Sequence, residues 1–249
     1  MNSGTVGKLM NETLWKHSGI QVVISAYNVE KYLIGCLLSV EESCKNHDWN
    51  LIFVDDGSTD HTFELAKDYI KNSSCQNHII TKYEKAKNVA QAKNRALKLT
   101  QKFKEKYPVI CVMDADDEMI PTRIDYLLPK LLSDKGLFIV GDYIIYVKNL
   151  EPQYVDVNKD KQNLRFGIWA TLFHQCLIPE NGRFFDENID IYSDFFKWRE
   201  LKRKNNINFI FHSGQPVHRF FRRKDSVSGS VPEDYINKLI QRKINNKSV

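Results

Sequence analysis

The residues best suited to chemistry are Asp114 and Asp116, which stand on either side of Ala115 directly after the apolar run 109–113. Asp117 follows them. Carboxylates this close together repel one another and cost stability unless a cation offsets their charge. Mg²⁺ and Mn²⁺ prefer oxygen ligands and usually bind through one or two carboxylates plus substrate phosphates. The motif predicts a metal site suited to a nucleotide diphosphate, although a lone Asp-x-Asp is more often an acidic turn that caps a helix.

A second acidic group, Asp55 and Asp56, follows a different apolar run and precedes Gly57. Glycine lets backbone approach a ligand closely, and the carboxylates can accept hydrogen bonds from a base N–H or a ribose hydroxyl. Tyr27, just past the first apolar run, could stack on a nucleobase through its ring face. Alone, these residues would be an ordinary turn and a core aromatic. Beside the Asp-x-Asp they indicate a site in which Asp55, Asp56 and Tyr27 hold the base.

The elements that must position these residues alternate in type along the first half of the chain. Short apolar, β-branched runs predict strands at 20–26, 51–54, 78–83 and 109–113. Helical spacing of apolar residues predicts helices at 29–40, capped by Asn28, at 63–70 and at 89–104. This alternation predicts a mostly parallel sheet, whose ligands bind beyond the carboxyl ends of the strands. Both acidic groups lie at such ends.

The second half of the chain has a less regular pattern. It predicts a helix at 121–132, a strand at 137–147, a helix at 192–204 and a strand at 207–211. Residues 148–163 are polar and predict a loop beside the site, and residues 166–173 are rich in aromatics. We expect that loop and the segment around Trp169 to supply the contacts that decide which substrates are used.

The order of these motifs resembles that of glycosyltransferase family 2, the inverting GT-A enzymes, over roughly residues 20–230. Residues 24–28 look like the family's opening strand, 54–60 match its nucleotide-binding turn, and 114–116 look like its metal motif. Residues 92–96 resemble its Ala-Arg-Asn-x-Gly helix start. The resemblance implies an α/β, Rossmann-like GT-A fold, with a mostly parallel central sheet flanked by helices and a small C-terminal lobe on the acceptor side.

The resemblance also assigns the donor site. It implies that the nucleotide sugar is held by residues from both acidic groups and their surroundings: Ser25, Tyr27, Asp55, Asp56, Lys93 and Asp114. Asp116 would hold the metal, and Asp114 the ribose or the metal. Ser25 replaces a frequent Pro of the family, and Lys93 replaces an Arg. Asn88 and Ala96 stand where the family often has Gly. Lys93 keeps a cation there, as a point charge rather than a planar fork.

Two further segments resemble the family's acceptor side. Residues 184–187 and 193–198 are similar to its Phe-Asp-Glu and Glu-Asp segments, whose final Asp is the catalytic base. Ser193 replaces the Glu and Asp194 is retained, so the resemblance implies that Asp194 is the base, with Asp186 and Glu187 as alternatives. Without the resemblance, an ordinary N-cap is the preferred interpretation of Asp194.

Residues 217–228 are similar to the family's basic, Ser-ending segment near the diphosphate. A His often lies three residues before the first Ser of that segment. Arg223 occupies this position here, and His218 lies further upstream. We expect Arg222 and Arg223 to neutralise the diphosphate, and His218 is a third candidate metal ligand beside Asp114 and Asp116.

Together these features predict inverting, Mn²⁺- or Mg²⁺-dependent transfer of a sugar from a nucleotide-sugar donor, with a UDP-sugar favoured, to a hydroxyl of a glycan or glycoconjugate. The corresponding domain map has an extension (1–19), a nucleotide-binding half (20–118), an acceptor half (119–230) and a C-terminal helix or tail (231–249). A nucleotidyltransferase would show a Gly-rich basic loop after the first strand, which residues 25–28 lack. A glycosidase would pair carboxylates without a metal turn of the diphosphate type.

From residue 197 onward the chain holds thirteen Lys or Arg against four Asp or Glu. A solvated basic face explains such an excess, as does a diphosphate, an anionic membrane or a nucleic acid. A DNA base as acceptor, as in some viral glycosyltransferases, therefore stays open, and so does a nucleic-acid-binding protein without catalysis.

The composition bounds these choices. Hydrophobic residues make up 42% and charged residues 27% of the 249 residues, as in a globular protein that buries a core. No apolar run approaches the roughly 20 residues of a membrane-spanning helix, and the first residues lack a signal-peptide pattern. We expect a cytoplasmic protein without a transmembrane segment. The five cysteines form no CxxC pair and are expected to be reduced, and Cys36 and Cys111 lie in apolar patterns that predict small core residues.

Overall fold

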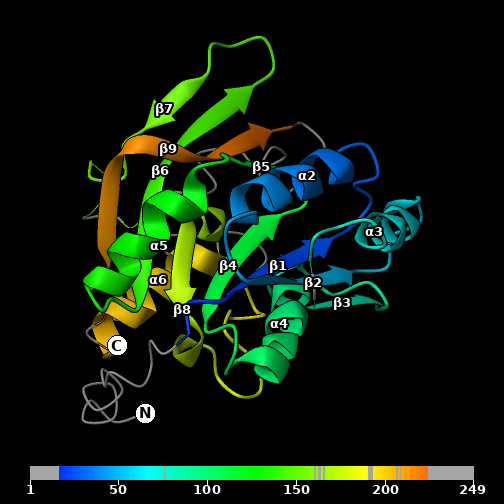
Figure 1. The fold of residues 1–249 in the computed structure, drawn as a ribbon, viewed down its shortest axis with the longest axis horizontal. Helices are drawn as coiled ribbons and strands as arrows, with labels where there is room; N and C mark the ends of the chain where they lie inside the picture. The colour runs from blue at the N-terminus through cyan, green and yellow to red at the C-terminus, as the bar shows by residue number, and fades with distance from the viewer. Residues whose placement is uncertain are drawn as a thin grey trace.

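The computed structural model describes residues 17–223, except 76, 160, 162, 163, 165, 190–192, 206 and 208. Within them, one mixed sheet carries helices on both faces (Figure 1). Its strand order is β3-β2-β1-β4-β8-β6-β9-β5, and β7 pairs with β6. This is the α/β class that the sequence predicts. The predicted extension 1–19 lies mostly outside the described residues, and the predicted tail 231–249 lies wholly outside them.

The first half of the chain forms the parallel part of the sheet. Its strands are β1 (Ile20–Ala26), β2 (Trp49–Asp55), β3 (Asn77–Lys82) and β4 (Val109–Asp114). The register pairs Ala26 with Asp55 and Ser25 with Asp114. The carboxyl ends of β1, β2 and β4 therefore meet at one edge, and both acidic groups lie there, as predicted.

Five α-helices cover this sheet in the described part of the chain. α2 (Leu33–Cys44), α3 (Thr62–Ile70) and α5 (Arg123–Ser133) belong to one hydrophobic cluster. α4 (Val89–Leu99) and α6 (Ser193–Asn205) belong to a second cluster on the opposite face. The amphipathic spacing of each helix explains this arrangement, because one stripe of each is apolar and must be buried.

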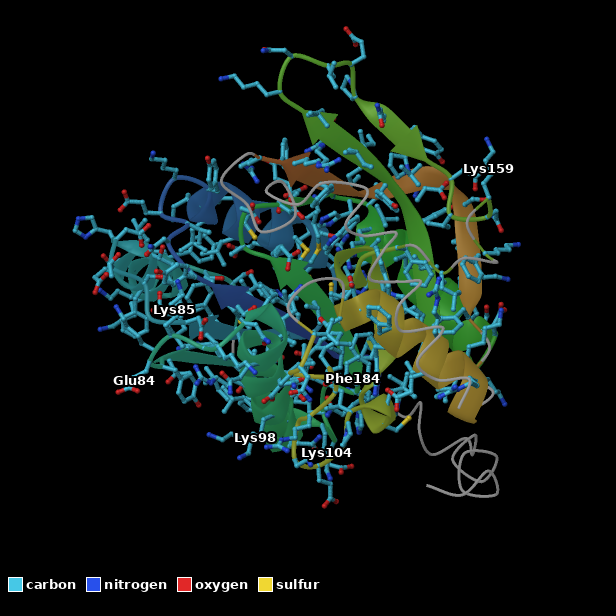
Figure 2. All side chains as sticks on the ribbon, turned by 180° about the vertical axis from the view of Figure 1, so that it is seen from behind. Glu84, Lys85, Lys98, Lys104, Lys159 and Phe184 are labelled. Carbon is cyan, nitrogen blue, oxygen red and sulfur yellow. The ribbon has the colours of Figure 1, made fainter. Side chains whose placement is uncertain are left out.

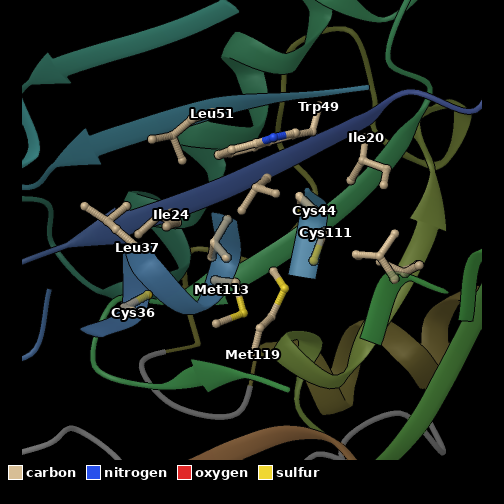
Figure 3. Packing of buried hydrophobic residues seen from close by; sticks show 14 of the residues in the cluster. Ile20, Ile24, Cys36, Leu37, Cys44, Trp49, Leu51, Cys111, Met113 and Met119 are labelled. Carbon is tan, nitrogen blue, oxygen red and sulfur yellow. The ribbon is translucent and has the colours of Figure 1, made fainter. Parts of the chain in front are cut away.

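Alternation along the strands divides the core between these two faces. Val22 and Ile24 of β1 pack toward α2, whereas Val23 between them packs toward α4. Figure 3 shows the first cluster, with Ile24 near Leu37 of α2 and Cys44 near Cys111 of β4. All five cysteines are free thiols, and Cys36 and Cys111 are buried in the core, as predicted.

The second half of the chain extends the same sheet with mixed strand directions. β8 (Thr171–His174) runs antiparallel to both β4 and β6 (Phe138–Val147). β9 (Ile210–Arg222) runs parallel to β6 and antiparallel to β5 (Glu118–Met119), the short strand after the acidic turn. These pairings bring the end of β9 back beside the carboxyl end of β4.

Aromatic side chains hold α6 against this part of the sheet. The ring of Trp198 is fully buried, lies 4.8 Å from that of Phe138 and 5.7 Å from that of Phe166, and its indole N–H donates to the Phe166 carbonyl at 2.9 Å. From behind, Figure 2 shows Phe184 between α4 and α6. The Phe184 ring stacks on that of Phe173, and its centroid lies 6.3 Å from that of Trp198 in α6.

Three local predictions are wrong in detail. Asn28 does not cap a helix: it has φ 52°, its amide donates to Ser58 Oγ at 2.9 Å, its Oδ1 accepts from the Thr59 amide at 2.8 Å, and α2 begins only at Leu33. Asn tolerates this left-handed conformation, so the residue joins two loops instead. The final strand spans Ile210–Arg222 rather than 207–211, because its pairing with β6 continues as far as Arg222.

The third difference concerns the predicted loop 148–163. It contains a short strand, β7 (Gln153–Val155), that pairs with β6 as a hairpin (Figure 1). The buried carboxylate of Asp142 anchors this hairpin, accepting hydrogen bonds from Tyr154 Oη, from the Val157 amide at 2.9 Å and from the Gly214 amide at 2.9 Å. Three short 3₁₀ helices complete the described elements: Thr100–Phe103, Ile168–Ala170 and Gln175–Leu177. None of the described helices combines the length and apolarity needed to cross a bilayer.

Candidate active site

The acidic turn, residues 114–117, follows β4 directly and is closed by the Asp117 amide, which donates to the Asp114 carbonyl at 3.1 Å. Two of its carboxylates are each paired with a cation. Lys93 Nζ of α4 lies 2.8 Å from Asp114 Oδ1, and Nη1 of Arg223, the residue after β9, lies 2.9 Å from Asp116 Oδ2. The structure thus brings four of the predicted site residues together around one turn.

The crowding of these carboxylates shifts their proton affinity. Burial raises the pKa of Asp116, the charge of Asp114 raises it further, and Arg223 opposes both. The pKa of Asp117 is raised well above its usual range by burial and then by Asp116 and Asp114. A cation near this turn therefore stabilises the ionised carboxylates, as expected for clustered carboxylates.

The donor atoms of the turn suit a hard divalent ion. Asp114 and Asp116 present partly exposed carboxylates, with side-chain exposures of 28% and 23%, so an ion can reach them. Among the described residues no three His, Cys, Asp or Glu side chains are grouped as a complete metal site. Two carboxylates fit the way in which Mg²⁺ and Mn²⁺ bind beside substrate phosphates, which supply further oxygen ligands.

The structure gives His218 a different environment from the one expected of a metal ligand. The residue is fully buried in β9, with Nε2 3.1 Å from Asp117 Oδ2 and Nδ1 3.4 Å from Arg123 Nη1. Burial and the Arg123 charge lower the pKa of His218 well below its ordinary value. Both ring nitrogens face protein groups, an arrangement that does not favour metal ligation, and we leave His218 out of the proposed metal site.

The Asp55 carboxylate stabilises the second acidic turn, which follows β2. It is fully buried, and its Oδ1 accepts hydrogen bonds from the amides of Gly57 at 3.1 Å and Ser58 at 2.9 Å. Gly57 has φ 83°, and a Cβ there would lie 2.7 Å from the Lys85 backbone nitrogen, so the turn requires glycine. The other oxygen of Asp55, Oδ2, is buried without a hydrogen-bond partner among the described residues. A contact from Asp55 to a base remains a proposal.

Asp56 faces a cation that the sequence motifs did not reveal. Its Oδ1 accepts from the Ala86 amide at 2.9 Å and from Arg95 Nη1 at 3.1 Å. Burial raises the pKa of Asp56, while the Ala86 amide and Arg95 lower it. Arg95 lies two residues after Lys93 on α4, and a search for charged residues on that helix would have found it.

Tyr27 presents a partly open ring beside this turn. It is 38% exposed, and Lys85 Nζ lies 3.6 Å from the ring centroid. An aromatic face of this kind can stack on a base. Ser25 is half-buried on β1, directly opposite Asp114 in the register, and the Arg222 side chain is exposed at the end of β9.

Asp194 lies in the first turn of α6. Its Oδ2 accepts from the Ile168 amide at 3.2 Å, and its Oδ1 from the Phe195 amide at 3.0 Å. Burial raises the pKa of Asp194, Lys93 and the Ile168 amide lower it, and Asp114 raises it. The charges of Lys93 and Asp114 act on the Asp194 carboxylate, and Lys93 is the cation that pairs with Asp114 of the acidic turn.

Asn94, a buried residue of α4, occupies the Asn position of the helix start that residues 92–96 resemble, and it holds the segment that leads to α6. Its Oδ1 accepts from the amides of Phe184 at 3.0 Å and Phe185 at 2.8 Å, and its Nδ2 donates to Phe185 O and Glu187 Oε1, both at 2.9 Å. Glu187 is thus engaged by Asn94, and Asp186 is exposed and accepts from the Asn188 amide at 3.0 Å. Burial raises the pKa of Asp194, which suits a group that accepts a proton.

Known proteins resemble this chain in sequence. The family model described as "Glycosyl transferase family 2" matches residues 21–225. The teichoic acid poly(glycerol phosphate) polymerase of Staphylococcus epidermidis is 28% identical over 206 residues, 78% of this chain and 27% of that protein. The cholesterol galactosyltransferase of Borreliella burgdorferi is 25% identical over 84% of this chain and 57% of its own length.

Solved structures give the same result for the fold. S. aureus TarS 1-349 in complex with UDP-GlcNAc has a TM-score of 0.67 at 17% identity, over 86% of this chain and 61% of that one. The complex of the same protein with UDP has a TM-score of 0.65. This likeness confirms the predicted GT-A fold class. The chain aligns with only 27% of the S. epidermidis polymerase and 18% of the chondroitin synthase of Escherichia coli. Because the family model matches more than four-fifths of the sequence, this chain belongs to glycosyl transferase family 2.

Proposed function

We propose that this chain transfers a sugar, with inversion, from a UDP-sugar to a hydroxyl of a glycan or glycoconjugate. The observation that carries the proposal is the acidic turn, whose Asp114 pairs with Lys93 and whose Asp116 pairs with Arg223, together with Asp194, on which the charges of Lys93 and Asp114 act. UDP is favoured because TarS, which has the same fold, is described in complex with UDP and with UDP-GlcNAc.

In this proposal Asp114 and Asp116 hold Mn²⁺ or Mg²⁺, which when bound offsets the charge that develops on the departing diphosphate. Lys93 and Arg223 lie beside the same carboxylates and can donate charge-assisted hydrogen bonds to diphosphate oxygens. Tyr27 follows β1 and Asp56 follows β2, and the uracil and ribose would be held at these two strand ends.

Asp194 acts on the second substrate. It accepts the proton of the acceptor hydroxyl while the hydroxyl oxygen forms a bond to the anomeric carbon and the bond from that carbon to the diphosphate oxygen breaks. Because the nucleophile enters from the side opposite the leaving group, the configuration at the anomeric carbon inverts. The Ile168 and Phe195 amides fix the orientation of the carboxylate for this step.

A glycan or glycoconjugate acceptor is supported by the descriptions of relatives. They include a chondroitin synthase from E. coli, 29% identical over 136 residues, and the cholesterol galactosyltransferase of B. burgdorferi. Neither these two nor the S. epidermidis polymerase is described as acting on DNA. The basic C-terminal part of the sequence lies partly beyond the described residues, and the acceptor class is proposed from these relatives alone.

Calorimetric titration with UDP tests the donor site directly. The wild-type chain should bind UDP in Mn²⁺, with affinity at least about tenfold lower in EDTA, because metal ligands and their supports typically contribute 10–100-fold. Asp116→Asn should bind UDP in Mn²⁺ as weakly as the wild type does in EDTA. The control Asp68→Asn, an exposed carboxylate on α3, should match the wild type.

Hydrolysis of a panel of sugar nucleotides, with Mn²⁺ and then EDTA, identifies the sugar. Metal-dependent release of UDP from one member of the panel supports the proposal. If the folded chain binds none of the nucleotides and hydrolyses none of the donors, the proposal is wrong.

A further inference from the structure

A row of three buried side chains lies beneath the acidic turn. Asp117, His218 and Arg123 are each at most 1% exposed, and they come from the turn, from β9 and from α5. His218 Nε2 lies 3.1 Å from Asp117 Oδ2, and His218 Nδ1 lies 3.4 Å from Arg123 Nη1. The histidine ring therefore separates a buried carboxylate from a buried guanidinium.

The chemistry of the two ends fixes the proton on the ring. A guanidinium only donates hydrogen bonds, so Nδ1 of His218 must accept from Arg123, even though the contact is long. The single ring proton is then on Nε2 and is donated to Asp117 Oδ2. Asp117 Oδ1 accepts from the Phe221 amide at 2.9 Å. Asp117 thus receives two donors from β9, one from a side chain and one from the backbone.

The same ring also touches the segment that orients Asp194. His218 stacks on Trp169 with ring centroids 4.6 Å apart and planes at 19°. The Ile168 amide, one residue before Trp169, is the group that donates to Asp194 Oδ2. Arg123 Nη2 donates to the Thr171 carbonyl at 2.9 Å, two residues after Trp169. His218 therefore contacts both the acidic turn and the segment 168–171, and Arg123 contacts His218 and the same segment.

We propose that His218 is a positioning residue that ties the acidic turn to β9 and to the segment 168–171. In this role it holds Asp117, and through the turn Asp116, opposite Arg223, and it fixes the Ile168 amide against Asp194. The effect on turnover rests on the proposed function, whereas the ring geometry does not. The role differs from metal ligation, because Nε2 gives its proton to a carboxylate and so has no lone pair for an ion.

The protonation of the ring tests this arrangement without any nucleotide. Histidine labelled with ¹⁵N reports which ring nitrogens carry protons, and the signal missing in His218→Gln assigns residue 218 among the seven histidines. We expect a neutral ring at neutral pH, protonated on Nε2 and not on Nδ1. A proton on Nδ1, or on both nitrogens, would overturn the proposal whether or not the chain binds UDP.

Two amide variants of His218 test the positioning role. The amide nitrogen of His218→Gln reaches the place of Nε2 and can donate to Asp117, whereas the shorter His218→Asn cannot. We expect His218→Asn to lower kcat by about tenfold or more, as for other lost supports of a site, with less than a threefold effect for His218→Gln. His212→Asn is the control, since His212 is also on β9 but stacks on Tyr126 away from the turn.

The other outcomes separate the alternatives. If both His218 variants lose Mn²⁺ affinity alike while His212→Asn keeps it, His218 is a metal ligand and the proposal fails. If both variants melt at equally reduced temperatures but keep the wild-type kcat when folded, the ring only fills space and the proposal also fails. Rescue of kcat by Gln and not by Asn is the result that supports it.

Discussion

Lys93 acts on two carboxylates, Asp114 and Asp194, to which the proposed function gives different roles. It pairs with Asp114 of the acidic turn, and its charge also lowers the pKa of Asp194. Burial lowers the pKa of Lys93, but Asp114 and Asp194 outweigh burial and hold that pKa above its ordinary value. Lys93 therefore stays protonated at neutral pH. One cation thus serves both the proposed metal and donor side and the proposed base.

Removing the charge of Asp194 should separate these two functions. We expect Asp194→Asn to reduce sugar transfer by at least about 10²-fold, a typical contribution of a positioned general base. UDP binding in Mn²⁺ should stay within threefold of the wild type, because the donor contacts come from other residues. Transfer rates and UDP titration on the same preparation measure both. Full activity of Asp194→Asn would show that the base is another group.

The pH dependence of transfer should reveal the environment of Asp194. Its pKa is raised, so the base form is lost at a higher pH than for an ordinary carboxyl, and kcat/KM should rise with pH through that raised pKa. Lys93→Met should move this acid limb to still higher pH, because a group that lowers the pKa is gone. An acid limb at the ordinary Asp value in both proteins would contradict the assignment.

The same shift has the opposite sign for stability. The folded chain binds the Asp194 proton more tightly than the unfolded chain does. The contribution of this group to stability is therefore full below its ordinary pKa and decreases as pH rises through the raised value. Stability and activity oppose each other at this residue.

At the scale of elements, α4 connects the two halves of the site. Its Lys93 and Arg95 reach the two acidic strand ends, and its Asn94 holds the backbone of the segment before α6. Because α4 carries these three residues one after another, it must keep its position relative to both acidic strand ends and to the segment before α6. Loss of the Asn94 hydrogen bonds should therefore affect the acceptor side first.

Asn94→Ala leaves two backbone N–H groups and one carbonyl without their partner in a buried place. We expect a loss of about 2–3 kcal/mol in the free energy of unfolding, measured by urea denaturation. Asn72→Ala, in an exposed turn, should change it by less than about 0.5 kcal/mol. Equal effects of the two substitutions would show that the Asn94 hydrogen bonds are not important for stability.

The strands that carry the site were predictable, but several of its partners were not. Apolar β-branched runs ending in Asp55 and Asp114 indicate buried strands with acidic ends, because few other patterns place carboxylates after such residues. Arg95 looks like an ordinary surface-helix residue in sequence, and Asn94 belongs to the helix-start motif, but only the tertiary fold shows what these two residues contact. The length of β9 was missed because its polar residues find partners across the sheet, as Arg219 does with Glu118.

Asn28 shows the same limit at a single residue. An Asn before a helical pattern is typical of an N-cap, and propensity alone favours that interpretation. The structure uses its amide group to join the turn at Ser58 and Thr59 instead. Local preference was overruled by a contact about 30 residues away, which no local pattern encodes.

At the scale of the whole molecule, one sheet separates two hydrophobic cores, and each core draws residues from both halves of the chain. Trp198 lies in the cluster that supports α6, and Trp49 lies at the start of β2 in the cluster under α2. The start of β2 is the end of the strand farthest from Asp55. The same substitution at these two positions should therefore have different functional effects.

Trp198→Phe removes the hydrogen bond to the Phe166 carbonyl and leaves a small cavity. We expect a loss of about 2 kcal/mol in stability together with lower transfer and intact UDP binding. Trp49→Phe should lower the stability but leave the transfer rate of the folded protein unchanged. Thermal melts paired with transfer assays check both. If both substitutions reduced the transfer rate equally at the same loss of stability, the two cores would not have separate effects on transfer.

The pairing of β5 with β9 has a consequence for how the protein is made. Glu118 meets Arg219, and Asp117 meets His218 across 101 residues of chain. Contacts this distant in sequence slow folding, because a long loop must close before any interaction stabilises the closed form. During synthesis the acidic turn leaves the ribosome long before β9 exists to hold it. Catalytic competence should therefore arise abruptly and late, after the final strand of the sheet has docked.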